Sequence, residues 1–384
     1  MFKNKFLGFA ILVSILLTFI MVVMQIPSVK SDLKDVPVAI VNEDDGKQGN
    51  KIVESLMGSK NKALDWHIVK SDKDLKKAMD KQQYYAAIVI PKNFSSSLGK
   101  LVDPTSKEVA NVTVVTNEAK NAQLATTLGS TLSTIVTKIG GGISAGILTN
   151  MAKANISVPA VTALKLNNPI TVKTTVRHST KGLTSANSSF FQPVWIASMV
   201  ISLLLFYAGN TKEFKSMKHK FSFKSSFIIS AIALAILTGF ATATYATWIL
   251  GFNFTHFMTI AAFLSFTSFA FIMLFSGVLT WIGFPGVIVF VLLLFFSIPL
   301  LAMAQPLVPQ FYQDWVLPWL PMRFLYDGGR SILYYGASFW NSSTVGLTYV
   351  LIIGGILFFA EGFSPKHRKV EREINEKIKV MEAK

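Results

Sequence analysis

An acidic run at residues 42–46, Asn-Glu-Asp-Asp-Gly, has the side-chain types that bind calcium. If Gly46 stood at position 6 of a calcium loop, Val41 would occupy position 1 and Ile52 position 12. Neither side chain can coordinate a hard cation. The run directly follows an apolar, β-branched stretch, so a turn that ends a strand explains it better, and we expect no metal site here.

The sequence also lacks the common signatures of catalysis. A phosphate-binding loop would need a lysine and a hydroxyl residue after its glycines, but Gly99-Lys100 is followed by Leu101, and no lysine follows Gly140-Gly141-Gly142. The five histidines are not spaced as zinc ligands, and cysteine is absent. We therefore predict no catalytic, cofactor-binding or metal-binding residues, and no enzymatic activity.

A basic segment, residues 210–225, has the composition of a docking element. It holds five lysines among three phenylalanines and one methionine. Anionic lipid headgroups are the default partner of such a segment at a membrane surface. The sharper hypothesis is a helix that docks a cytosolic partner, with the candidate residues Phe214, Lys215, Met217 and Lys218.

A second polar segment, residues 305–340, combines prolines, aromatic residues and two arginines. This composition is typical of a segment that lies at the membrane interface or partly re-enters the membrane. Arg323 and Asp327 are four residues apart, a spacing that allows an ion pair on a helix. We predict that Arg330 meets a lipid phosphate or a backbone carbonyl; snorkelling arginines in an interfacial belt are the alternative.

These segments belong to a strongly apolar chain. Hydrophobic residues make up 51% of its 384 residues and charged residues only 15%, well below the share in soluble domains. The formal net charge is +16, but no zinc-finger spacing or basic recognition helix accompanies it, so we expect no nucleic acid partner. Membrane lipids are the expected surroundings.

Six stretches are long and apolar enough to cross a bilayer, which takes about 20 residues. They are residues 6–26, 190–209, 227–250, 258–281, 287–304 and 344–360. The first follows two lysines and has no cleavage signature after it, so we interpret it as an uncleaved anchor. The prediction is an α-helical six-span bundle.

Basic residues set the expected orientation. Two, five and seven Lys or Arg residues lie in the segments 1–5, 210–225 and 361–384. The short segments that fall on the other side, 251–257 and 305–343, hold two arginines. Because short cytosolic segments are rich in Lys and Arg, we expect both termini in the cytosol and residues 27–189 outside the cell, in a multi-pass plasma-membrane protein.

The long segment between the first two spans predicts an inserted extracytoplasmic α/β domain. Apolar β-branched runs alternate with runs of helical spacing between residues 36 and 116. Ser71, with Asp74 three residues later, predicts the start of one helix. Strands are expected at 36–41, 66–69, 85–90, 109–115 and 171–176, and helices at 51–57, 71–79 and 94–102.

Residues 118–154 predict a long helix, or a pair interrupted at residues 140–142 by three glycines. Its apolar face either covers the domain or pairs with the same helix of a second subunit. The expected organisation is therefore a first span in 1–26, an α/β domain in 27–189, a five-helix membrane domain in 190–360 and a basic cytosolic tail in 361–384.

Three blocks of the sequence then resemble those of the YhgE/Pip family. They are VPVAIVNEDDG at 36–46, LDWHIV at 64–69 and YYAAIVIPKNFS at 84–95. The segment from Pro321 to Arg330 resembles that family's block before the last helix. Each block alone is weak, but the blocks occur in the family's order.

This resemblance implies an ABC-2-type exporter permease: a homodimer that moves an amphipathic or lipid-like substrate outward with a separate ABC ATPase. The alternative is a non-transporting membrane receptor or scaffold of an envelope or secretion complex, as in phage infection or type VII secretion. The chain lacks the long outer insertion of larger family members, and only five residues precede its first span.

Overall fold

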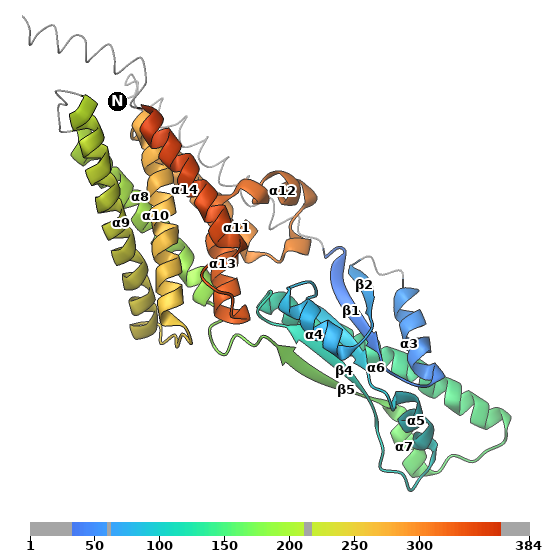
Figure 1. The fold of residues 1–384 in the computed structure, drawn as a ribbon. Helices are drawn as coiled ribbons and strands as arrows, with labels where there is room; N and C mark the ends of the chain where they lie inside the picture. The colour runs from blue at the N-terminus through green and yellow to red at the C-terminus, as the bar shows by residue number, and fades with distance from the viewer. Residues whose placement is uncertain (1–32, 60–62, 211–216, 362–384) are drawn as a thin grey trace, which may run out of the picture. The chain divides into compact units, whose positions relative to one another are not determined.

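The computed structural model describes residues 33–59, 63–210 and 217–361 (Figure 1). Contacts within the chain divide it into two units. The α/β unit comprises the described residues of Lys30–Thr184 and of Met303–Pro309. The helical unit comprises the described residues of Ser185–Ala302 and of Gln310–Lys384. The predicted first span, residues 6–26, lies outside the described residues.

The α/β unit is built on one five-stranded sheet in the order β2-β1-β3-β4-β5. The strands are β1 (Val36–Asn42), β2 (Leu64–Val69), β3 (Ala86–Ile90), β4 (Ala110–Asn117) and β5 (Ile170–Arg177). Only the β3–β4 pair is antiparallel. All five strands lie where β-branched, apolar runs predict them.

Helices cover both faces of this sheet, because alternate side chains of a strand point to opposite faces. Ile40 joins the larger core, which also takes residues from α3 (Lys47–Met57), α5 (Phe94–Gly99) and α6 (Ala122–Lys153). Val41 joins the smaller core under α4 (Asp72–Asp80). Ser71 caps α4 as predicted, since its Oγ accepts the N–H of Asp74 at 3.2 Å.

The α6 helix is continuous, so the alternative of two helices interrupted at residues 140–142 is wrong. It runs without a break for 32 residues, so the glycines at 140–142 do not interrupt it. A Cβ on Gly140 would lie 3.3 Å from the side chain of Ile170, so this glycine lets α6 approach β5. Two short helical segments were not predicted from the sequence, α7 (Ala160–Asn167) and the 3-10 turn η2 (Gln305–Leu307). A further turn, η1 (Lys100–Val102), follows α5.

The helical unit contains five long helices in its described part. They are α8 (Ala186–Asn210), α9 (Met217–Trp248), α10 (Phe257–Ile282), α11 (Pro285–Ala302) and α14 (Ser342–Ala360). Between α11 and α14 the chain forms α12 (Gln310–Trp315), the turn η3 (Leu317–Trp319) and α13 (Pro321–Tyr335). The helix that contains the third predicted span begins ten residues before that span, because α9 is already helical at Met217.

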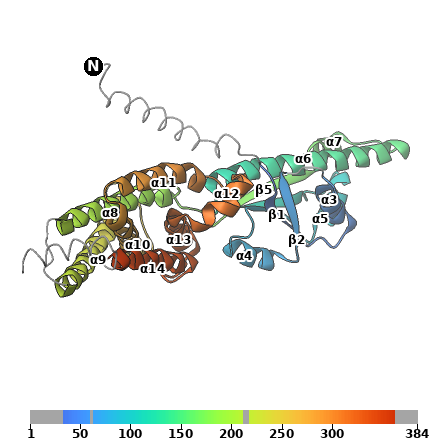
Figure 2. The ribbon, with the colours of Figure 1, turned by 90° about the horizontal axis from the view of Figure 1, so that it is seen from above.

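The α10 helix lies at the centre of the helical unit, packed against α8, α9 and α14 (Figure 2). Glycine permits its closest crossing. A Cβ on Gly354 of α14 would lie 2.4 Å from the backbone nitrogen of Leu274, and one on Gly277 would lie 2.6 Å from the Gly354 carbonyl. Small residues at helix crossings are typical of membrane bundles, where close backbone approach supplies the packing energy.

In the described part of the chain, six helices are long and apolar enough to span a membrane: α6, α8, α9, α10, α11 and α14. The last five coincide with predicted spans. The α6 helix instead packs on the sheet, with Leu128 and Val136 in the core of the α/β unit. The fold class, a helical membrane protein with an inserted α/β domain, is confirmed.

Candidate functional site

The predicted interfacial residues lie together on α13. Arg323 Nε is 3.0 Å from one carboxylate oxygen of Asp327, and an Arg330 guanidinium nitrogen is 3.3 Å from the other. Arg330 also lies over the ring of Tyr326, 5.1 Å from its centroid. We call these three charged residues the Arg–Asp–Arg cluster. The acid and Arg323 are each more than a third exposed.

The opposite face of α13 is apolar and buried within the helical unit. Met322, Leu325 and Ile332 lie on it at helical spacing. Two glycines, Gly328 and Gly329, bring this face close to its neighbours. A Cβ on Gly328 would lie 2.3 Å from the ring of Phe263, and the Asn187 amide next to Gly329 donates to the Tyr326 carbonyl at 2.7 Å. The helix is thus amphipathic and fixed in position.

A second group of charges joins the start of α9 to the end of α14. Lys224 Nζ is 3.1 Å from one carboxylate oxygen of Glu361, and Lys220 Nζ is 3.6 Å from the other. Lys224 also donates to the carbonyl of Phe358, in the last turn of α14. All three charged side chains are buried, at most 11% exposed. We call them the Lys–Glu–Lys cluster.

This cluster was not predicted from the sequence. Lys220 and Lys224 were expected in a basic loop at the membrane surface, and Glu361 was not among the candidate residues. One sequence feature indicated that the two lysines act together: Lys220 and Lys224 are four residues apart and would share one face of a helix. The structure shows that the segment is helical from Met217 onward and that Lys220 and Lys224 face into the unit rather than toward lipid headgroups.

Between the two clusters, the five long helices in the described part of the helical unit carry no charged side chain. No Asp, Glu, Lys or Arg occurs in α8, α10, α11, α14 or in α9 beyond Lys224. Trp195 is fully buried among the rings of Phe271, Phe275 and Phe290. The hydroxyls of Ser198 and Ser268 meet at 2.9 Å. Aromatic rings and hydroxyls therefore line the helix contacts.

In the α/β unit, Asp44 ties together the first and third sequence blocks. One carboxylate oxygen accepts the Ser95 N–H at 2.9 Å; the other accepts the Ser95 hydroxyl at 2.5 Å and the Gly49 N–H at 2.9 Å. Burial raises the pKa of Asp44, but these hydrogen bonds outweigh it, so the pKa lies below its usual value. The acidic turn is thus a structural clasp between two loops.

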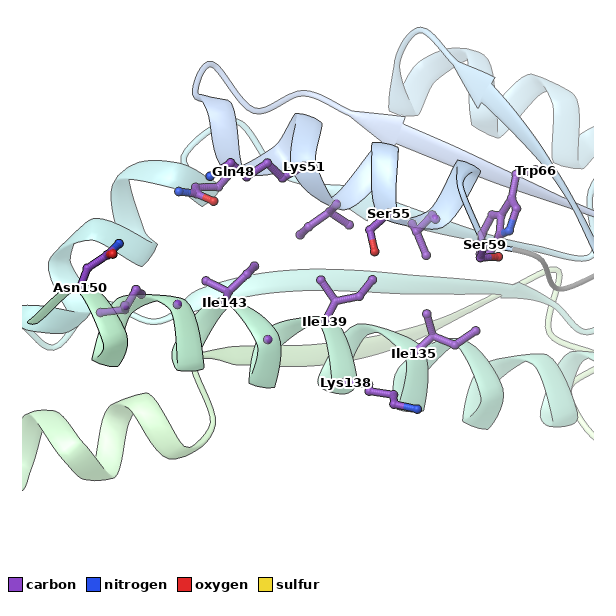
Figure 3. Close-up of a pocket in the computed structure, with 15 residues that line it drawn as sticks. Gln48, Lys51, Ser55, Ser59, Trp66, Ile135, Lys138, Ile139, Ile143 and Asn150 are labelled. Carbon is purple, nitrogen blue, oxygen red and sulfur yellow. The ribbon is translucent and has the colours of Figure 1, made fainter. Parts of the chain in front are cut away.

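The same unit carries an open groove between α3 and α6 with a volume of about 740 Å³ (Figure 3). The isoleucines 135, 139, 143 and 147 repeat every four residues of α6 and line one wall. Ile52 and Leu56 of α3 line the other wall. Gln48, Lys51 and Asn150 lie toward one end, and Ser59 and Trp66 toward the other. Its lining residues include Lys51 and Lys138 but no acid.

The sequence matches a family model over most of its length. The model of the ABC-2 family transporter proteins matches residues 5–361. The chain belongs to the ABC-2 transporter family. A solved domain described as that of an ABC type-2 transporter from Thermotoga maritima MSB8 is 22% identical; the match covers 40% of this chain and 99% of that one, with a TM-score of 0.27. No curated protein matches the chain.

As a member of the ABC-2 family, the chain is an integral membrane component of a transporter and is not itself catalytic. Within the residues that the structure describes, no group of three or more His, Asp or Glu side chains could hold a metal ion. The finer YhgE/Pip assignment stays a prediction.

The predicted docking residues fall at the edge of what the structure describes. Phe214 and Lys215 lie outside the described residues, and Met217 and Lys218 form the start of α9. Their docking role stays a prediction, as does an interfacial role for Arg323, Asp327 and Arg330.

Proposed function

We propose that this chain is the membrane subunit of an exporter that moves an amphipathic or lipid-like substrate outward, driven by a separate ATPase. The observation that carries the proposal is the lack of charged side chains, between the two clusters, in the five long helices of the described helical unit. Charged groups within a membrane mark the paths of ions and polar substrates. Trp195 and its ring neighbours, with the Ser198–Ser268 contact, instead give the helix contacts an apolar lining, which suits a substrate with apolar groups.

The position of the Lys–Glu–Lys cluster supports an energy input at one end of the unit. Basic segments favour the cytosolic side, and α9 begins with Lys218, Lys220 and Lys224. Because the cluster ties α9 to α14, a force applied to the segment before α9 would reach both helices. This is the side on which a cytosolic ATPase acts in the proposal.

A homodimer belongs to the same proposal. ABC-2-type permeases, which the sequence resembles, work as dimers with a separate ATPase. Chemical cross-linking in intact membranes is expected to give a dimer of this chain. A strictly monomeric particle in native lipid would contradict both the dimer and the permease assignment.

Purification from native membranes tests the ATPase directly. We expect a protein that binds Mg-ATP and hydrolyses it to co-purify with the chain in a fixed ratio. The double variant Phe214→Ala with Met217→Ala should abolish this association, because docking helices rely on apolar contacts. The matched variant Lys215→Gln with Lys218→Gln should weaken it only in part and in a salt-dependent way.

The opposite pattern would contradict the docking proposal. If the apolar pair can be removed without loss of the ATPase while the lysines determine membrane attachment, the segment is a lipid anchor. If no ATP-hydrolysing protein accompanies the chain under any condition, the exporter proposal fails.

A further inference from the structure

The α3–α6 groove exposes apolar surface in a form that suits an elongated ligand. Ile139, Ile143 and Ile147 pack against the core of the α/β unit yet stay only partly buried. From Ile135 to Asn150 the groove follows 15 residue steps of α6, roughly 22 Å at 1.5 Å per residue. Its volume of about 740 Å³ falls in the range of small-molecule sites.

Two glycines of α6 leave part of the floor of the groove without side chains. Gly142 and Gly146 are four residues apart on α6, and both line the groove. A Cβ at either position would meet no atom within 4 Å. The space above this stretch of backbone is therefore open to a ligand, whereas Gly140 on the same helix is packed against Ile170.

The polar residues of the groove indicate the charge of its ligand. Figure 3 shows Gln48, Lys51 and Asn150 toward one end and the isoleucines between that end and Trp66. Lys51 and Lys138 are both exposed and no acid lines the groove. A cation with two neighbouring amides suits an acidic head, and the isoleucine wall suits a hydrocarbon chain.

We propose that this groove binds a single-chain anionic amphiphile, with its acyl chain along the isoleucines of α6 and its acidic head at Lys51. This inference deepens the proposed function, on which it rests for its meaning, because it gives the exported substrate a chemical class. Binding itself requires neither ATP nor an ATPase. The site can therefore be tested apart from transport.

The test uses the full chain in phosphatidylcholine nanodiscs and a palmitic acid that carries a photoreactive diazirine on its chain. Mass spectrometry of the irradiated protein locates the attached probe. We expect saturable attachment to the 139–147 stretch of α6. Attachment confined to the long helices of the helical unit would report bilayer contact alone and would overturn the proposal.

Two neighbouring glycines provide a matched pair of variants. Gly142→Leu places a side chain in the groove and should reduce attachment to α6 by about tenfold or more, a loss of about 1.4 kcal/mol in binding. Gly141→Leu lies on the same helix, also meets open space and does not line the groove. It should leave attachment unchanged. Gly146→Leu serves as a second blocking variant if Gly142→Leu does not fold.

A second pair tests the head group. Lys51→Gln should weaken binding of the acid several-fold, whereas Lys47→Gln, one turn earlier on α3 and outside the groove, should not. The methyl ester of the same probe carries no charge and should lose the dependence on Lys51. Equal binding of acid and ester to both variants would contradict the proposal that an acidic head group binds at Lys51.

A second copy of the chain is the competing occupant. If α6 cross-links to α6 of another subunit and Gly142→Leu abolishes that cross-link instead of probe attachment, the groove is a dimer contact and the proposal is wrong.

Measurements of binding and of export separate the groove site from the exporter proposal. Probe binding without export in reconstituted vesicles would leave the groove site intact and contradict only the exporter proposal. If export persists after Gly142→Leu, the exporter proposal stands and the groove does not bind the exported substrate.

Discussion

The helical unit holds two charged clusters of the same composition, two bases and one acid, at the two ends of α14. The Arg–Asp–Arg cluster lies on α13, where Gly328 packs beside Ser343 at the start of α14. The Lys–Glu–Lys cluster includes Glu361, the residue after α14 ends. The helix has 19 residues and is roughly 28 Å long, close to the hydrocarbon thickness of a bilayer.

The two clusters differ in burial, and this difference decides what each contributes. Asp327 is 36% exposed, whereas Glu361 is 9% exposed. An exposed ion pair contributes little because water competes for both charges. A buried charge depends on its partners, because their loss leaves it without compensation in a medium of low dielectric. We infer that the buried cluster holds α9 to α14 and that Arg323 and Asp327 of the more exposed cluster can meet lipid or substrate, whereas Arg330 is 18% exposed.

Because the two clusters lie at the two ends of α14, we expect them on opposite faces of the membrane. In intact cells, a membrane-impermeant maleimide should label Ser338→Cys, which follows α13. It should label Lys218→Cys, at the start of α9, only after permeabilisation. The effect is all or none because the reagent cannot cross the bilayer.

The chain has no cysteine of its own, so each variant carries a single reactive group. Lys60→Cys, between α3 and β2 in the sequence, should be labelled like Ser338→Cys. Reaction of Lys218→Cys in intact cells would contradict the orientation and would place the buried cluster on the outer side.

Removal of the buried acid should give the largest loss of stability. Glu361→Gln leaves Lys220 and Lys224 facing each other without a counter-charge, and breaking a buried pair in this way costs about 3–5 kcal/mol. The free energy of unfolding of the full chain in a denaturant titration measures this loss.

A triple variant sharpens the result. Lys220→Met, Lys224→Met and Glu361→Leu together remove every charge of the cluster, and well-packed apolar replacements of buried ion pairs are often neutral. This variant should recover most of the stability lost in Glu361→Gln. A triple variant as unstable as the single one would show that backbone contacts, not charges, hold the helices.

The two clusters also show how far the sequence could predict the structure. Arg323 and Asp327 are four residues apart, so helical spacing alone predicts their pair. Lys224 and Glu361 are 137 residues apart, and only the packing of α9 on the end of α14 brings them together. Local pairs can be read from spacing, whereas pairs between helices depend on a three-dimensional arrangement that one sequence does not specify.

The α/β unit follows the same rule. Its strands and most helices were predictable because apolar periodicity is local. The α3–α6 groove was not, because its two walls are separated in the chain and meet only in the fold. The continuity of α6 was left open because glycine lowers helix propensity, and the packing of Gly140 on Ile170 outweighs that tendency.

Asp44, unlike the acids of the two clusters, is held by hydrogen bonds, with Ser95 and glycine N–H groups as its partners. Its pKa is depressed, so its contribution to stability is complete above the usual carboxyl pKa of about 3.9 and is lost as the pH falls through the lower folded value. Asp44→Asn should destabilise the loops at Gly49 and Ser95 by about 1–2 kcal/mol at neutral pH, because hydrogen bonds to a half-exposed charge are moderately strong. Hydrogen exchange of the Gly49 and Ser95 amides measures the change.

The neighbouring residue is the control for that change. Asp45→Asn removes an acid that is 73% exposed and lies 3.7 Å from Lys92, and it should not alter exchange at Ser95. If both variants behave alike, net charge rather than the clasp determines the local stability.

The smallest effect is expected at the exposed cluster. Asp327→Asn keeps the shape of the side chain but removes its charge, and Arg323 remains exposed enough to be solvated. The ring of Tyr326 still faces Arg330. The loss in free energy of unfolding should therefore stay below about 1 kcal/mol, measured in the same titration as Glu361→Gln. A loss as large as that of Glu361→Gln would mean that burial does not distinguish the two clusters. A small loss of stability together with a loss of export would mean that the charges of the Arg–Asp–Arg cluster act on substrate or lipid rather than on the fold.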